Sequence, residues 1–162
     1  MCIRDRLNTA AGVHFDPAVS ARIYELSVKA ASEPSRANVR TRMEWLMLDP
    51  TQLTDEMVEL RYRVYCQPGF ARAMENIMCL HTAKYRIPNL LTKDELASIK
   101  APTLVVWTSH DPGSSVAIGR QLADSIPGSS FIVMDKCGHW PQFEDALNFN
   151  KVHHAFLSGR GG

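Results

Sequence analysis

The strongest constraint on the fold is a strand–helix–strand pattern in the last third of the chain. Residues 103–108 (Thr-Leu-Val-Val-Trp-Thr) are almost continuously apolar and rich in β-branched and aromatic side chains. Such a run is typical of a parallel strand that is covered on both faces. Residues 115–126 follow with apolar side chains four apart, as in an amphipathic helix, and residues 131–134 resemble a second buried strand. The pattern predicts a βαβ unit and therefore an α/β fold.

Upstream of this unit the sequence is helical from Asp16 to about Leu80. Proline is tolerated in the first turn of a helix but not in its interior, so proline-containing pairs mark the helix boundaries. These boundaries are expected at Asp16-Pro17, Pro34-Ser35, Asp49-Pro50 and Pro68-Gly69. Thr54 is the predicted N-cap of the third helix, and residues 92–95 form a capping box that opens a further short helix. One more helix is expected over residues 143–157, with an inner side formed by Ala146, Phe149, Val152, His153 and Phe156.

These patterns divide the chain into four expected segments. Residues 1–6 lack apolar periodicity and a capping residue, and we interpret them as a non-native leader. Residues 7–15 are expected to end a core strand and begin a loop, residues 16–92 to form a helical lid, and residues 93–162 to form a carboxyl-terminal α/β core. Because two clear strands cannot partner so many helices, we expect an incomplete domain whose first strands precede these residues.

Composition excludes several functional classes. The 162 residues are 45% hydrophobic and 22% charged, which is typical of a globular domain rather than a disordered chain. A net charge of +1 gives no basic surface for nucleic acid or an anionic membrane, and no segment resembles a membrane span or a secretory signal. We therefore expect a cytoplasmic protein with no nucleic-acid or membrane partner. The four cysteines are scattered without a C-x-x-C pair, so we expect free thiols and no metal site.

The most specific candidate site combines an acid and an imidazole. Asp111 follows the first predicted strand, and His139 follows the second within a Gly-His turn. The carboxyl ends of neighbouring parallel strands meet at one edge of the sheet, where α/β proteins place their ligands. A carboxylate there can hold the Nδ1–H of histidine and leave Nε2 free as a base. Either residue alone is usually a turn former, and it is their combination that favours catalysis.

Longer stretches around these residues resemble a known family. Residues 100–112 and the run Cys137-Gly-His-Trp-Pro-Gln-Phe-Glu-Asp145 are similar to the carboxyl-terminal end of the α/β-hydrolase superfamily. Residues 54–77, with Glu59-Leu-Arg-Tyr62 and Pro68-Gly-Phe70, resemble the helical lid of the meta-cleavage product hydrolases. That family splits 2-hydroxy-6-oxo-hexa-2,4-dienoates in bacterial degradation of aromatic compounds. The resemblance covers nearly all of the chain after residue 7.

The resemblance implies a role for each matching residue. Asp111 would orient His139, and His139 would act as the general base of a serine-dependent hydrolase that cleaves a C–C bond. Arg61 would contact the carboxylate end of the dienoate, and Trp140 would line the pocket. The family needs neither a metal nor an organic cofactor, and the full-length enzyme is compatible with a homo-oligomer.

Arg61 is also notable from the sequence alone. On a helical wheel it falls within an apolar stripe formed by Met57, Val58, Tyr62 and Tyr65, while Glu59 and Arg63 form an i,i+4 pair on the other side. A buried arginine needs an anionic partner, which a substrate carboxylate could supply. The alternative is that its stem packs and its guanidinium reaches water or a protein carboxylate.

The sequence departs from the family at the nucleophile. It contains no Gly-x-Ser-x-Gly elbow and no His-Gly-Gly-type oxyanion loop, so the chain alone is expected to be inactive. One alternative is another lidded α/β-hydrolase (an esterase, epoxide hydrolase or dehalogenase), which would use Asp111 and His139 but would not need Arg61. A second alternative is a non-catalytic remnant of the fold.

Overall fold

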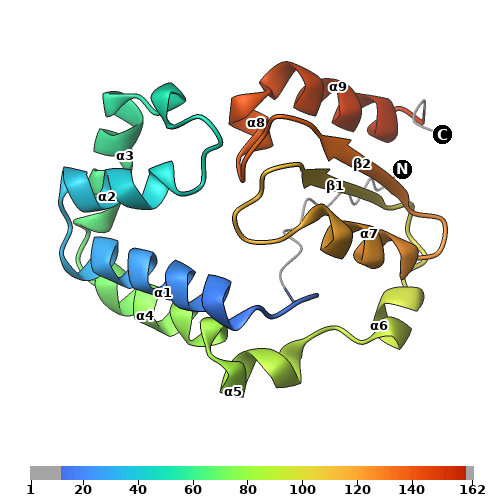
Figure 1. The fold of residues 1–162 in the computed structure, drawn as a ribbon, viewed down its shortest axis with the longest axis horizontal. Coiled ribbons are helices and arrows are strands. Elements are labelled where there is room, and N and C mark those ends of the chain that lie inside the picture. The colour runs from blue at the N-terminus through green and yellow to red at the C-terminus, as the bar shows by residue number, and fades with distance from the viewer. Residues whose placement is uncertain (1–11, 160–162) are drawn as a thin grey trace.

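The computed structural model describes residues 12–159. The expected leader, residues 1–6, and most of the strand end expected within residues 7–15 lie outside that range. Residues 12–15 form a turn and irregular backbone that leads into the first helix. In Figure 1 the helices of the first half of the chain lie to one side, and a small sheet with its own helices lies to the other.

The first half of the described chain is helical, as its proline pattern predicts. We call α1–α5 the helical layer. Its elements are α1 (Pro17–Ser32), α2 (Arg36–Glu44), α3 (Asp55–Tyr65), α4 (Phe70–Met78) and α5 (Ala83–Arg86), joined by short 3-10 turns η1 (Pro50–Gln52), η2 (Cys79–His81) and η3 (Ile87–Asn89). The predicted helix start at Asp16-Pro17 and the predicted N-cap Thr54 are confirmed, because Asp16 accepts the Val19 N–H at 2.9 Å and Thr54 accepts the Met57 N–H at 3.2 Å.

The helical layer has its own hydrophobic core. Its buried members come from α1, α2, α3 and the turn before α3: Ala30, Val39, Met43, Leu53, Val58 and Tyr65. Tyr65 stacks on Phe70 with ring centroids 4.5 Å apart, which fixes α4 against the end of α3. Ile77 of α4 does not join this core, because 56% of this residue is exposed.

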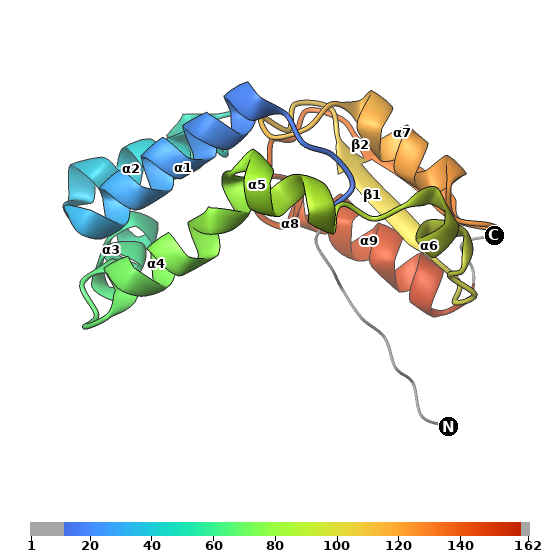
Figure 2. The ribbon, with the colours of Figure 1, turned by 90° about the horizontal axis from the view of Figure 1, so that it is seen from below.

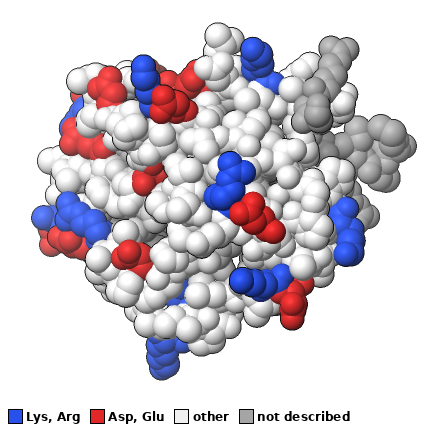
Figure 3. All heavy atoms as spheres, turned by 45° about the vertical axis from the view of Figure 1, so that its right-hand side comes forward, with Lys and Arg blue, Asp and Glu red and all other residues white. Residues whose placement is uncertain are grey.

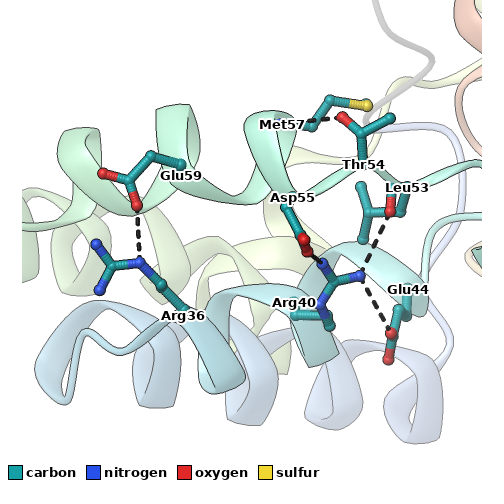
Figure 4. Close-up of polar contacts among 8 residues, drawn as sticks. All are labelled: Arg36, Arg40, Glu44, Leu53, Thr54, Asp55, Met57 and Glu59. Carbon is teal, nitrogen blue, oxygen red and sulfur yellow. Dashed lines mark hydrogen bonds and ion pairs between the residues drawn. The ribbon is translucent and has the colours of Figure 1, made fainter.

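Ion pairs on the solvent side join α2 to α3, as Figure 4 shows. Arg36 donates to Glu59 at 2.8 Å, and Arg40 reaches Asp55 and the Leu53 carbonyl. The predicted pair within α3 is confirmed, since Arg63 donates to the same Glu59 at 2.9 Å. The two arginine partners of Glu59 hold the pKa of its carboxyl below the usual value.

The second half of the chain forms the predicted βαβ unit. Helix α6 (Lys93–Ala97) begins at the predicted capping box, in which Thr92 and Glu95 bond reciprocally. Strands β1 (Leu104–Thr108) and β2 (Ser130–Met134) pair in parallel, with Leu104 opposite Ser130 and Thr108 opposite Met134. Helix α7 (Val116–Asp124) connects them and packs on β1 through a core that includes Val105, Trp107 and Ala123.

The last helix differs from its prediction. Residues 141–157 form two helices, α8 (Pro141–Glu144) and α9 (Ala146–Leu157), rather than one helix over 143–157. The chain turns at Asp145, which is not helical and whose side chain caps α9 by accepting the Asn148 N–H. Phe149, Val152, His153 and Phe156 are partly buried as expected, whereas Ala146 is exposed.

Helices α7 and α9 lie on opposite sides of the two strands in both Figure 1 and Figure 2. The prediction that both strands are covered on both faces is only partly correct within residues 12–159. Val133 of β2 is 38% exposed, and Leu147 of α9 is 81% exposed. In the described residues the sheet therefore leaves apolar surface in water.

The surface carries charges of both signs. Figure 3 shows basic and acidic side chains interspersed on one face, separated by broad uncharged areas. Within residues 12–159, no helix has both the length and the apolar character needed to cross a lipid bilayer.

Candidate active site

The candidate site lies where β1 and β2 end. Two backbone hydrogen bonds continue the pairing beyond the strands, since the Ser109 N–H donates to the Met134 carbonyl at 3.0 Å and the His110 N–H donates to the Cys137 carbonyl at 3.0 Å. These bonds hold the turn after β1 against the turn after β2. Asp111 and His139 sit on these adjoining turns, as the sequence predicts.

The structure brings Asp111 and His139 into direct contact. Oδ2 of Asp111 lies 2.7 Å from Nδ1 of His139, and Oδ1 accepts the Gly113 N–H at 2.6 Å. Burial tends to raise the pKa of Asp111, but the hydrogen bond and charge of His139 and the N–H groups of Gly113 and Ser114 outweigh it and hold this pKa below its usual value. An ionised Asp111 accepts the Nδ1–H and leaves Nε2 available to take a proton. The imidazole is accessible, with 48% of its side chain exposed.

The histidine turn is clamped against a segment of the helical layer. We call residues 46–48, which follow α2, the crossing segment. The His139 N–H donates to the Leu46 carbonyl at 2.7 Å, and the Leu48 N–H donates to Glu144 of α8 at 2.7 Å. Gly138 packs so closely on this segment that a Cβ there would lie 2.6 Å from the Leu46 oxygen and the Leu48 nitrogen. The glycine of the Gly-His turn is therefore required by close backbone approach.

Arg61 of α3 and Trp140, which follows His139, lie beside each other. The guanidinium carbon of Arg61 is 5.7 Å from the centre of the Trp140 ring, within the range of a cation–π contact. Both residues line an open pocket of about 290 Å³, together with Met43, Met57, Leu60 and Val64. The expectation that Arg61 is buried at the centre of an apolar stripe is wrong. The residue is exposed, and α3 instead buries Val58 and Tyr65 on the neighbouring face.

A second open hollow lies on the other side of Asp111. It has a volume of about 640 Å³ and is lined by the start of α1, including Asp16, and by the loop between β1 and α7. Asp111 therefore lines the 640 Å³ hollow, whereas Trp140, which follows His139 on the neighbouring turn, lines the 290 Å³ pocket.

Two other histidines of the described chain make contacts away from the pair of Asp111 and His139. The Nδ1 atom of His110 contacts the Ser109 hydroxyl at 2.7 Å, and the Nδ1 atom of His153 contacts the Phe149 carbonyl within α9. Burial raises the pKa of the Cys137 thiol, so it is not an activated nucleophile. Among the described residues no group of three metal-binding side chains comes together, and Cys66, Cys79 and Cys137 are free thiols.

A family model described as "alpha/beta hydrolase fold" matches residues 21–146, which is most of the chain. The chain belongs to this family. The α/β-hydrolase assignment fits the observed geometry, because the acid and the imidazole follow successive parallel strands. The fold class predicted from the sequence is thereby confirmed.

Individual relatives of this α/β hydrolase refine the comparison. It is 33% identical over 132 residues to a 2-hydroxymuconate semialdehyde hydrolase of Pseudomonas putida, covering 77% of this chain and 44% of the relative. It is 30% identical over 149 residues to a 2-hydroxy-6-oxo-6-phenylhexa-2,4-dienoate hydrolase of Comamonas testosteroni, covering 91% of this chain and 50% of the relative. The resemblance to meta-cleavage product hydrolases stated from the sequence is confirmed. The α/β hydrolase spans half or less of the length of these relatives.

Solved structures agree on the fold. The meta-cleavage product hydrolase of Pseudomonas fluorescens IP01, in a mutant complexed with acetates, superposes with a TM-score of 0.73 at 23% identity. That superposition covers 92% of this chain and 53% of the other. At this identity the likeness is one of fold.

Sequence reasoning missed two parts of the site in this α/β hydrolase. Glu144 lies in the run from Cys137 to Asp145 that resembles the family, but its sequence position does not reveal that it accepts hydrogen bonds from Leu48, Gly138 and Trp140. The role of the crossing segment could not be predicted from the sequence, because its contacts with the histidine turn and Glu144 are made by backbone atoms. An acidic residue in the first turn of the helix after a Gly-His turn was the one available indication.

Proposed function

We propose that this chain supplies the lid, the acid and the base of a hydrolase that cleaves the C–C bond of 2-hydroxy-6-oxo-hexa-2,4-dienoates. The observation that carries the proposal is the 2.7 Å contact between Asp111 and His139 at the ends of neighbouring parallel strands. The names of two relatives support this substrate class, since one is a 2-hydroxy-6-oxo-6-phenylhexa-2,4-dienoate hydrolase and the other a 2-hydroxymuconate semialdehyde hydrolase.

The proposed reaction assigns a proton-transfer role to His139. Asp111 holds the Nδ1–H and fixes the tautomer, so that Nε2 takes and returns protons. A serine attacks the C6 ketone of the ketonised substrate, the bond between C5 and C6 breaks, and its electron pair moves to the 2-oxo group, which takes a proton to give a 2-hydroxypentadienoate. Water then hydrolyses the acyl-serine and releases the carboxylic acid. The sequence has no Gly-x-Ser-x-Gly motif, so the proposal assigns the nucleophile and the oxyanion donors to protein outside these 162 residues.

Arg61 is proposed to bind the carboxylate end of the substrate, and Trp140 to line the pocket. The exposed guanidinium at the rim of the 290 Å³ pocket can reach a bound anion. The indole of Trp140 supplies an apolar wall next to that charge. The cytoplasmic location, the lack of nucleic-acid and membrane partners, and the homo-oligomer remain predictions.

The test is an assay of the protein expressed from the complete reading frame that encodes this chain. Loss of dienoate absorbance and formation of the carboxylic acid are measured with His139→Ala and Arg61→Ala variants, with Arg63→Ala on the same helix as the control. We expect kcat to fall about 10³-fold or more for His139→Ala. We expect KM to rise about 10- to 100-fold for Arg61→Ala, because a charged hydrogen bond is lost.

Two results would contradict the proposal. Hydrolysis of simple esters with no turnover of dienoates, and no effect of Arg61→Ala, would favour another lidded hydrolase. No turnover of either substrate class by the folded protein would favour a non-catalytic member of the fold.

A further inference from the structure

The carboxylate of Glu144 meets three backbone N–H groups. Oε2 accepts the Gly138 N–H at 2.9 Å and the Trp140 N–H at 3.2 Å, while Oε1 accepts the Leu48 N–H at 2.7 Å. The first two groups flank His139 on either side, and the third belongs to the crossing segment. One side chain thus bonds both to the histidine turn and to the helical layer.

The imidazole of His139 depends on this backbone for its orientation. Its side chain is 48% exposed, so packing alone does not fix the ring, and Asp111 bonds only Nδ1. The main-chain N–H of His139 is held by the Leu46 carbonyl at 2.7 Å, which again ties the turn to the crossing segment. If the turn moved by an ångström, the ring would leave Asp111 or point Nε2 away from the substrate.

We propose that Glu144 is a positioning residue for His139: its bonds to the Gly138 and Trp140 N–H groups hold the backbone on either side of the imidazole and so keep the ring on Asp111, while its bond to Leu48 ties this turn to the crossing segment. Hydrogen bonds to a carboxylate are stronger than those between neutral groups, which suits one residue that holds two segments. The part of this inference that concerns catalysis rests on the proposed function, whereas the positioning itself is a property of the fold.

The two oxygens of Glu144 allow the positioning role to be separated from a general effect on stability. Glu144→Ala removes every bond to Gly138, Trp140 and Leu48. Glu144→Gln keeps one acceptor oxygen, and we expect that oxygen to remain with Gly138 and Trp140, because two donors face it there. The amide nitrogen then opposes the Leu48 N–H, and only the link to the crossing segment is lost.

The first measurement is NMR of the protein expressed from its complete reading frame. In Glu144→Ala we expect amide exchange at Gly138, Trp140 and Leu48 to be about tenfold faster or more, and the hydrogen-bonded Nδ1 proton of His139 to broaden or vanish. In Glu144→Gln only Leu48 should exchange faster, and the Nδ1 proton should remain.

Two control variants accompany this measurement. Asp111→Ala should remove the Nδ1 proton signal while the exchange at Gly138 and Leu48 stays at the wild-type rate. Gln142→Ala, an exposed position on the same helix as Glu144, should change neither. The positioning role would be overturned if folded Glu144→Ala kept an unchanged Nδ1 proton signal. It would also be overturned if Glu144→Gln kept that signal while the Gly138 amide exchanged as fast as the Leu48 amide.

The second measurement is steady-state turnover of a dienoate. A misplaced base lowers kcat without weakening substrate binding, so Glu144→Ala should lose about 10²-fold in kcat with little change in KM, and Glu144→Gln should recover most of that loss. A rise in KM with unchanged kcat would overturn the inference. A protein that turns over no dienoate would refute the proposed function alone, because the NMR comparison still tests the positioning.

Discussion

At the scale of single residues, Asp111 is the group whose surroundings most clearly serve the site. Its carboxylate bonds the ring of His139 and the backbone of the loop that follows β1. These hydrogen bonds lower its pKa even though burial opposes ionisation. The residue therefore links the stability of the folded protein to the charge state of the site.

This link predicts a pH dependence of stability. Folding lowers the pKa of the Asp111 carboxyl, so this group stabilises the protein at pH values above its pKa in the unfolded chain, which is about 4. The contribution is lost as the pH falls through the lower pKa of the same carboxyl in the folded protein. We expect Asp111→Asn to lower the free energy of unfolding at pH 7, and the difference from wild type to shrink as pH falls below about 4. Urea unfolding at several pH values measures it, and a constant difference down to pH 2 would contradict the assignment.

Gly138 gives a second prediction at this scale. A Cβ would lie 2.6 Å from backbone atoms of the crossing segment, which cannot move like the end of a flexible side chain. We expect Gly138→Ala to lower the free energy of unfolding by about 1–3 kcal/mol and to shift the amide resonances of Leu48 and His139. Gly128→Ala is the control for the resonances: its φ of 71° strains any side chain, so stability falls there too, but its neighbourhood is open and the resonances of Leu48 and His139 should stay in place.

The residues of the site differ in how far the sequence could predict them. Asp111 and His139 were predictable because each follows a strand, and parallel strands bring their ends together. The burial of Arg61 was predicted wrongly, since helical spacing places it beside Val58 but does not say where the buried face ends. Glu144 was missed because its partners are backbone N–H groups, which side-chain patterns do not reveal, and one of them, that of Leu48, lies far away in the chain.

At the scale of elements, α3 connects the helical layer to the pocket. Its N-cap Thr54 fixes where the helix starts, and its last turns carry Arg61 and Val64 to the pocket wall. The ion pairs of Figure 4 then join α3 to α2 on the solvent side. These pairs are exposed, so we assign the position of α3 to its buried face and its cap rather than to them.

The cap supplies the prediction for this element. Thr54→Ala removes the hydroxyl that accepts the Met57 N–H, and we expect the free energy of unfolding to fall by about 1 kcal/mol. Thr54→Ser keeps a hydroxyl and should recover most of the loss in the same urea titration. Equal losses in both variants would show that the methyl group, rather than the cap, matters.

Most helix boundaries were predicted where a proline or a capping side chain marks them, but α2 ends at Glu44, before the Asp49-Pro50 pair that was expected to end it. Thr54 and Thr92 cap helices as expected, and Asp16 and Ser35, at two of the expected boundaries, are also N-caps. The break at Asp145 was missed because Pro141 starts a helix of one turn and the apolar spacing runs on past it. Periodicity reports which side chains share a face but does not detect a turn within the repeat.

At the scale of the whole molecule, the described chain leaves apolar surface uncovered around the sheet. Leu147 and Leu157 of α9 are 81% and 60% exposed, and Val133 of β2 is 38% exposed. In the described residues β1 pairs with β2 alone, so its other edge has unpaired backbone groups. Exposed apolar patches and open strand edges favour association.

This surface predicts the behaviour of the 162-residue chain in solution. We expect it to elute from a sizing column as species larger than a monomer, in proportions that rise with concentration. The double variant Leu147→Lys and Leu157→Lys should reduce this association, whereas Arg22→Ala, on an exposed turn of α1, should not. A monomer at every concentration would contradict the prediction.

The backbone contact between residues 46–48 and the histidine turn bears on protein engineering. Exchanging the helical layer for that of a relative treats this layer as a separable module. Here its main chain bonds directly to the backbone of His139, so a graft whose junction lies inside residues 46–48 would displace the imidazole. Donor and recipient pieces are best joined on either side of these residues, with the acidic residue of the helix after the histidine turn transplanted alongside.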